Sequence, residues 1–167
     1  MPFIEDSADT IGHTYEGQNT GKLSDLVTTS FYASHIITCA GIGGMICTND
    51  KDIYENIVML RGWGRSSALF NEDEDFKKRF GKKLNGIKYD SKYIFEDFGY
   101  NFLPSEISAA FALEQIKKLK KNINKKEKNF KKLYNFFKKL NYFFELPQQN
   151  RHLKTAWLAF PLLIKNQ

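Results

Sequence analysis

Three residues near the start of the chain, Asp6, Ser30 and His35, carry side chains that could take part in one reaction. A histidine exchanges protons near neutral pH, and a serine hydroxyl beside backbone amides can hold a phosphate. An aspartate at the end of a buried strand needs a positive partner, such as a protonated ring nitrogen. Taken singly, the same residues also suit a loop cap, a turn hydroxyl and an ordinary loop histidine.

Short strands are the elements that would have to position these side chains. Residues 2–5 form an apolar run that predicts a buried strand ending at Asp6, and residues 26–32 are rich in β-branched and aromatic residues. Residues 44–48 predict a further strand, and residues 155–164 predict a last one. Glycines at 41, 43 and 44 follow His35 and indicate a turn or a close approach of backbone to a ligand.

Two helices are predicted between these strands. Asn49 or Asp50 caps the first, which runs toward Leu60. Pro104 and Ser105 open the second, which continues to about residue 140 with a bend near residue 120. Residues 61–93 read as a long irregular excursion. Strands that alternate with helices predict an α/β layer architecture, in which ligands bind beyond the carboxyl ends of the strands.

The net charge of +6 is a local feature of the second helix. Residues 117–139 hold eleven lysines and one glutamate, whereas the remainder of the chain has a balance of −4. Apolar residues recur at three- and four-residue steps through this run, as on a helix with one buried stripe. The lysines are interpreted as the solvated face of that helix; a nucleic-acid patch and a surface for another part of the molecule are the alternatives.

Composition excludes several other classes of protein. A hydrophobic content of 42% and an aromatic content of 15% argue against a disordered chain. No apolar run approaches the length of a membrane span, so no membrane partner is expected. Cys39 and Cys47 lack metal-ligand spacing and are interpreted as reduced thiols, which suits a cytoplasmic location.

Four segments together resemble the DegT/DnrJ/StrS family of pyridoxal-phosphate enzymes, which act on nucleotide-linked keto sugars. They read FIEDSADTIGHTYEGQNTGKLSD, TTSFYASHIITCAGIGGMICTND, RGWGR and GYNFLPSEISAAFALEQIKKL. The resemblance implies the central part of the large domain of an aspartate-aminotransferase-like fold, with three layers and a mainly parallel sheet. It also implies pyridoxal or pyridoxamine 5'-phosphate as the cofactor.

The same resemblance implies roles for individual residues. Asp6 matches the aspartate that pairs with the pyridinium nitrogen, and Ser30 matches the residue that binds the cofactor phosphate. Asn101 matches an asparagine that reaches the phosphate of the neighbouring subunit, which implies a homodimer with shared sites. Asp9 falls where many members carry Gln or His near the cofactor ring.

His35 stands where most members have the lysine that binds the cofactor covalently. Histidine at this position resembles the 3-dehydratase branch, in which the amine form of the cofactor is held noncovalently and the histidine moves protons. The implied reaction is C3 dehydration of a nucleotide-linked 4-keto-6-deoxyhexose, with glutamate as amino donor. An ordinary sugar aminotransferase and an inactive remnant of one are the alternatives; no lysine lies between Lys22 and Lys51.

Some dehydratases of this branch hold a 2Fe-2S cluster through cysteines that follow a WGR motif. In this chain, Trp63-Gly64-Arg65 is followed by Ser66 and Ser67, so no iron–sulfur cluster is expected. The chain also differs from the family around residues 40–44, where it is one residue longer, and at Ile36, where the branch tends to have a second histidine.

The family's length leads to an expectation about domain organisation. Residues 1–140 are expected to form part of the large cofactor-binding domain, with a long helix from about residue 104. Residues 141–167 are expected to begin the smaller C-terminal domain. The resemblance therefore implies a fragment that lacks the N-terminal third and most of the C-terminal domain, and that binds the cofactor poorly by itself.

Overall fold

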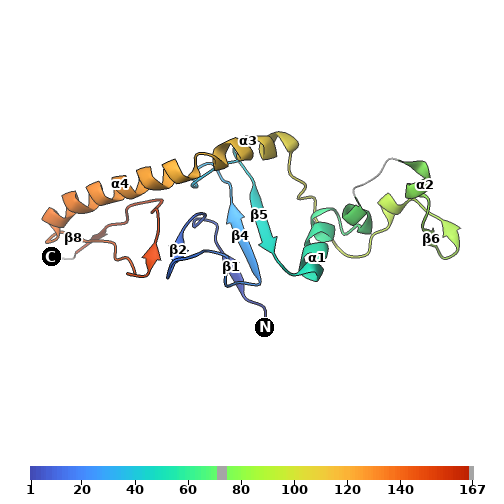
Figure 1. The fold of residues 1–167 in the computed structure, drawn as a ribbon, viewed down its shortest axis with the longest axis horizontal. Coiled ribbons are helices and arrows are strands. Elements are labelled where there is room, and N and C mark those ends of the chain that lie inside the picture. The colour runs from blue at the N-terminus through green and yellow to red at the C-terminus, as the bar shows by residue number, and fades with distance from the viewer. Residues whose placement is uncertain (71–74, 166–167) are drawn as a thin grey trace. The chain divides into compact units, whose positions relative to one another are not determined.

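The computed structural model describes residues 1–70 and 75–165 of the chain (Figure 1). The chain divides into two units. The first consists of Met1–Cys47 together with Ser105–Gln167, and the second of Thr48–Pro104. The predicted boundary near residue 140 stays a prediction.

The first unit contains a three-stranded sheet in the order β1-β4-β5. Its strands are β1 (Ile4–Asp6), β4 (Leu26–Ser30) and β5 (Gly44–Thr48). β1 and β4 are parallel, with Asp6 opposite Thr28, and β5 runs in the opposite direction beside β4 (Figure 1). Because the carboxyl ends of parallel strands meet at one edge of a sheet, Asp6 and Ser30 come to the same edge.

The strands at positions 2–5 and 26–32 are confirmed with small shifts, but the predicted burial of the first strand is wrong. Ile4 in β1 is 62% exposed. β1 pairs only with β4 among the described strands, so its other edge has no described strand beside it.

Short antiparallel pairs complete the strands of this unit. β2 (Thr14–Tyr15) pairs with both β3 (Gln18–Asn19) and β9 (Leu153–Lys154), and β8 (Phe144–Glu145) pairs with β10 (Leu163–Ile164). The prediction of a strand over residues 155–164 is therefore wrong except for its last two residues. Pro161 lacks the N–H that a ladder needs, and the Thr155 and Ala156 polar groups bond to a histidine side chain instead.

The predicted long helix consists of two helices, α3 (Glu106–Ile116) and α4 (Leu119–Phe137), with a final turn η3 (Lys138–Leu140). The break at residues 117–118 lies close to the predicted bend. Most lysines of α4 are exposed, as the solvated-face interpretation predicts. Most residues of the apolar stripe are partly buried, but Leu133 is 42% exposed. Leu119 packs against a small core of Phe31, Ile37 and Cys39.

The second unit begins with α1 (Lys51–Arg61), which Asp50 caps by accepting a hydrogen bond from the Ile53 amide at 3.0 Å. The predicted irregular excursion follows. It contains η1 (Ser66–Phe70), α2 (Phe76–Arg79), the hairpin β6 (Lys83–Leu84) and β7 (Ile87–Lys88), and η2 (Ser91–Tyr93). In the part of the chain that the structure describes, no helix is both long and apolar enough to cross a membrane.

Candidate cofactor site

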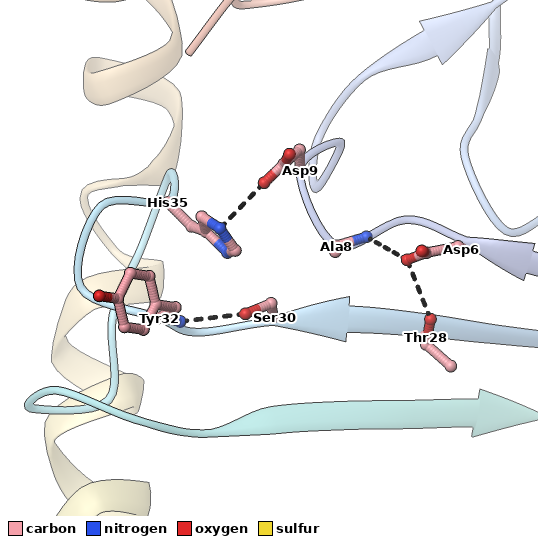
Figure 2. A network of polar contacts seen from close by, with 7 residues as sticks. All are labelled: Asp6, Ala8, Asp9, Thr28, Ser30, Tyr32 and His35. Carbon is pink, nitrogen blue, oxygen red and sulfur yellow. Dashed lines mark hydrogen bonds and ion pairs between the residues drawn. The ribbon is translucent and has the colours of Figure 1, made fainter. Parts of the chain in front are cut away.

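Asp6 is the last residue of β1, and its carboxylate lies at the carboxyl edge of the sheet (Figure 2). Its Oδ1 atom accepts hydrogen bonds from the Ala8 amide at 3.1 Å and the Thr28 hydroxyl at 3.4 Å. An ionised carboxylate has about four acceptor positions. Asp6 is therefore held in place locally and keeps acceptor capacity for a further donor.

Ser30 ends β4 at the same edge, where the chain turns sharply. Its Oγ atom accepts a hydrogen bond from the Tyr32 amide at 3.2 Å, which leaves the hydroxyl proton available to donate. The Tyr32 carbonyl in turn accepts a hydrogen bond from the His35 amide at 3.0 Å. This turn brings the imidazole back toward the end of the strand (Figure 2).

The imidazole of His35 is oriented by Asp9. Its Nε2 atom lies 3.0 Å from Oδ1 of Asp9, and the two side chains are 19% and 58% exposed. The ring of Tyr32 meets the imidazole edge-on at 5.6 Å between centroids. In a neutral imidazole, the nitrogen that faces a carboxylate is assigned the proton. In His35 this nitrogen is Nε2, so Nδ1 carries the lone pair. Nδ1 is buried and has no hydrogen-bond partner among the described residues.

The glycine-rich segment after His35 closes the turn against the strand. The Phe31 amide donates to the Gly43 carbonyl at 2.8 Å, and the Cys39 amide donates to the Phe31 carbonyl at 3.2 Å. Gly43 has a φ of 157°, and a Cβ placed there would lie 3.0 Å from Cβ of Cys39. The segment therefore needs a glycine at this position to pack closely behind the His35 turn.

Helix α4 supplies two polar side chains near this site that the sequence did not single out. The Asn122 amide donates to the Ile36 carbonyl at 3.3 Å and so holds the backbone next to His35. Burial lowers the pKa of Lys126, and the nearby charge of Asp9 opposes that shift. Asn122 and Lys126 are four residues apart beside the apolar stripe, and this spacing is the signal in the sequence that could have indicated them.

Asn101 belongs to the second unit. It forms an isolated antiparallel bridge with Gly62, and its neighbours Tyr100 and Phe102 bond to the backbone at the end of α1. Its predicted contact with a cofactor phosphate in a neighbouring subunit stays a prediction.

The residues gathered at this edge fit pyridoxal phosphate. Asp6 offers an acceptor for a protonated ring nitrogen, Ser30 offers a hydroxyl donor for a phosphate, and His35 presents an unpartnered buried nitrogen. Among the described residues, no group of three or more histidine, cysteine, aspartate or glutamate side chains is placed to hold a metal ion.

The sequence pattern of the DegT/DnrJ/EryC1/StrS aminotransferase family matches residues 1–167. The chain belongs to this family. The family's cofactor is pyridoxal phosphate, and its members are aminotransferases and dehydratases. The predictions of the family and of its cofactor are thereby confirmed.

Relatives and solved structures agree with this membership. The chain is 34% identical to the lipopolysaccharide biosynthesis protein RfbH of Salmonella typhimurium over 98% of its own length and 38% of that protein. It is 39% identical to the dTDP-4-dehydro-2,6-dideoxy-D-glucose 3-dehydratase of Saccharopolyspora spinosa over 70% of its length and 26% of that enzyme. The E. coli GDP-4-keto-6-deoxy-D-mannose-3-dehydratase with bound hydrated PLP superimposes with a TM-score of 0.78 at 27% identity, over 99% of this chain and 40% of that one.

These comparisons support the α/β aminotransferase fold, whereas the three-layer, mainly parallel arrangement stays a prediction. The chain spans about 38% of the length of the first of these relatives and a smaller share of the second.

Proposed function

We propose that this chain carries the proton-transfer part of a pyridoxamine-phosphate-dependent 3-dehydratase that acts on a nucleotide-linked 4-keto-6-deoxyhexose. The observation on which this rests is His35, which stands at the position of the family's lysine with Nε2 on Asp9 and Nδ1 without a partner. The similarity to two 3-dehydratases supports the same reaction.

The cofactor, when bound, supplies an electron sink beside the substrate carbon. Two residues of this chain would hold it. Asp6 would accept a hydrogen bond from the protonated ring nitrogen and keep that nitrogen charged, because a carboxylate favours the positive form. Ser30, at the end of β4, would donate its hydroxyl proton to the phosphate.

His35 would carry the proton that the dehydration moves. The His35 imidazole would accept a proton from the cofactor's methylene carbon, and the Asp9 carboxylate, 3.0 Å from Nε2, would stabilise the positive charge on the ring. The imidazole would afterwards give this proton to the departing C3 hydroxyl, which would leave as water.

The proposal also includes the substrate, the amino donor, the oligomeric state, the location and the domain organisation of the protein. The substrate is a nucleotide-linked keto-deoxysugar, glutamate restores the amine form of the cofactor, and the protein works as a homodimer in the cytoplasm. Residues 1–140 belong to the large domain of a three-layer fold with a mainly parallel sheet, and residues 141–167 begin the smaller domain.

Replacing His35 tests the proposal in the naturally produced protein. In His35→Lys, we expect loss of dehydration and a new ability of borohydride to fix the cofactor covalently to the chain. In His35→Asn, we expect the same loss of dehydration without covalent fixation. Dehydration that continues unchanged in both variants would refute the role of His35.

The second candidate is an aminotransferase in which another lysine forms the covalent link to the cofactor. The partial burial of Lys126 favours this candidate. Burial lowers the pKa of this amine, although the charge of Asp9 opposes that shift. Borohydride would then fix the cofactor to the unsubstituted protein but not to Lys126→Ala. Absence of turnover in every preparation that binds cofactor and substrate would indicate an inactive remnant.

A further inference from the structure

The exposed side of helix α4 carries charge of one sign. Of the eleven lysines in residues 117–139, only Lys126 is partly buried, and the others are exposed. At about 100° per residue, the six exposed lysines of α4 lie within an arc of about 140°. They define the lysine face, and they are Lys120, Lys121, Lys125, Lys128, Lys131 and Lys132. The other residues in this arc are Asn124 and Asn135, while the one acid of α4, Glu127, lies outside it.

The lysine face is not neutralised by other described residues. None of its six lysines has a hydrogen bond or an ion pair with the part of the chain that the structure describes. Within the face, Lys121, Lys125 and Lys128 follow one another at four- and three-residue steps, so like charges are neighbours and repel. Alternating charge signs are typical of a helix face that contacts only water, and this face lacks them. The arrangement therefore favours an anionic partner.

Aromatic packing fixes the opposite side of α4. Phe130 stacks on Trp157 at 5.0 Å between ring centroids, and Phe137 stacks on Phe160 at 5.6 Å. Both Phe130 and Phe137 belong to the apolar stripe and are partly buried. The helix cannot turn this stripe toward a partner while the packing holds, so a partner would meet the lysine face.

An exposed aromatic ring lies at the end of the lysine face. Phe136 follows Lys132 by four residues, which makes the two side chains neighbours on the helix surface, and Phe136 is 60% exposed. Tyr142 and Phe143, which come just after η3, are 63% and 42% exposed. Exposed aromatic rings beside lysines are typical of proteins that lie on a bilayer, where the rings reach the level of the head groups.

Two features favour a bilayer over a nucleic acid. Residues 117–139 contain no arginine, and the guanidinium is the group that binds phosphates and base edges through paired hydrogen bonds. The lysine face also has no aromatic ring between its lysines on which a base could stack. A bilayer with anionic head groups needs only point charges that reach its surface.

We propose that the lysine face of α4 binds the surface of a bilayer that contains anionic phospholipids, with Phe136 at the level of the head groups. The length rule that excludes a membrane span does not apply here, because a surface contact needs no span. Each lysine near an anionic surface contributes about fivefold in affinity, so several together give measurable binding. The proposal is independent of the reaction assigned to His35.

Cosedimentation of the natural protein with vesicles tests the proposal. We expect binding to vesicles of phosphatidylcholine that contain about one third phosphatidylglycerol, and binding at least about tenfold weaker to phosphatidylcholine alone. Raising the salt from about 0.1 M to about 0.5 M should release the protein, because salt screens exposed charges. Phe136→Ala should weaken binding a few-fold.

Two fourfold variants with the same loss of net charge locate the binding surface. Affinity for the anionic vesicles should fall by about a hundredfold or more in the variant with Lys121→Gln, Lys125→Gln, Lys128→Gln and Lys132→Gln. The matched control changes four exposed lysines outside α4, and its affinity should stay within about threefold. Its substitutions are Lys22→Gln, Lys83→Gln, Lys88→Gln and Lys154→Gln.

Titration with a DNA duplex of arbitrary sequence at the same salt distinguishes the two kinds of polyanion. DNA binding that the α4 variant loses, without binding to anionic vesicles, would show a nucleic-acid surface and overturn the proposal. Equal binding to anionic and neutral vesicles also overturns it, as does equal weakening in the two fourfold variants. Circular dichroism checks that each variant is folded. If the α4 variant is not folded, the double variant Lys121→Gln/Lys128→Gln takes its place, with an expected loss of about tenfold or more.

Discussion

The Nε2 atom of His35 lies 3.0 Å from Oδ1 of Asp9, so a carboxylate from the loop after β1 orients the imidazole that follows β4. This contact joins the two parallel strands beyond their carboxyl ends (Figure 2). It also decides which ring nitrogen is available, because Nδ1 is left without a partner among the described residues.

Asp9→Asn tests this relationship in the natural protein. The neutral amide cannot stabilise a positive imidazole, so we expect turnover to fall by about tenfold to a hundredfold with little change in cofactor affinity. Glu16→Gln is the matched control, since Glu16 forms a longer pair with His152, at 3.7 Å, away from the site. Equal turnover in Asp9→Asn and the unsubstituted enzyme would mean that Asp9 does not assist His35.

Ser30→Ala should weaken binding of pyridoxamine phosphate. A hydrogen bond to a charged phosphate contributes about 1.5–3 kcal/mol, which corresponds to an affinity loss of about tenfold to somewhat more than a hundredfold. Spectroscopic titration measures it. Ser24→Ala serves as the control, because the Ser24 hydroxyl bonds only locally, to the Gly21 carbonyl at 3.2 Å. If both variants bind alike, Ser30 is a turn hydroxyl and does not bind the phosphate.

His13 predicts a pH dependence of stability. The residue is only 2% exposed. Its Nε2 atom accepts a hydrogen bond from the Ala156 amide at 3.0 Å, and its Nδ1 atom lies 3.0 Å from the Thr155 hydroxyl oxygen. Nε2 must therefore be unprotonated. Burial lowers the pKa of His13 below 6.5; Glu127 opposes the shift and Lys126 adds to it.

The sign of the effect follows from this lowered pKa. The unfolded chain binds the proton more readily, so the contribution of His13 is complete above pH 6.5 and is lost as the pH falls toward the lowered pKa. Denaturant unfolding should show a steeper acid loss in the natural protein than in His13→Gln, which should itself be about 1–3 kcal/mol less stable at neutral pH. Parallel pH profiles of the two proteins would show that His13 does not titrate in this way.

Gly64, in the second unit, occupies a position that cannot accept a side chain. Its φ is +74°, and a Cβ there would lie 1.9 Å from the carbonyl oxygen of Asp97. Gly64→Ala should cost about 3–5 kcal/mol in the free energy of unfolding, because the backbone of another segment would have to move. Gly86 also has a positive φ, of +82°, but has nothing within 4 Å of such a Cβ, so Gly86→Ala should cost only about 1–2 kcal/mol. Similar losses in the two variants, measured by thermal unfolding, would show that the close contact is relieved.

The residues within and next to each element were sufficient to predict much of the secondary structure of this chain. The cap at Asp50, the extent of α1 and β5, and the break between α3 and α4 follow from side-chain chemistry within a few residues. The match of Asp6, Ser30 and His35 to the family's site residues depends on residue identity and spacing, and it stays a prediction.

Contacts between residues far apart in the sequence decided the features that were predicted wrongly. Residues 155–162 read as a strand, yet two of their polar groups bond to His13, which lies far away in the sequence. The exposure of Ile4 likewise depends on which strands are present beside β1.

The sequence by itself determined the family of this protein and its cofactor, because these are properties of residue order. Only the tertiary structure decided that Asp9 orients His35 through Nε2 and that Asn122 supports the next residue. Such pairings depend on how distant segments are folded together, and a pattern of local spacing does not contain that information.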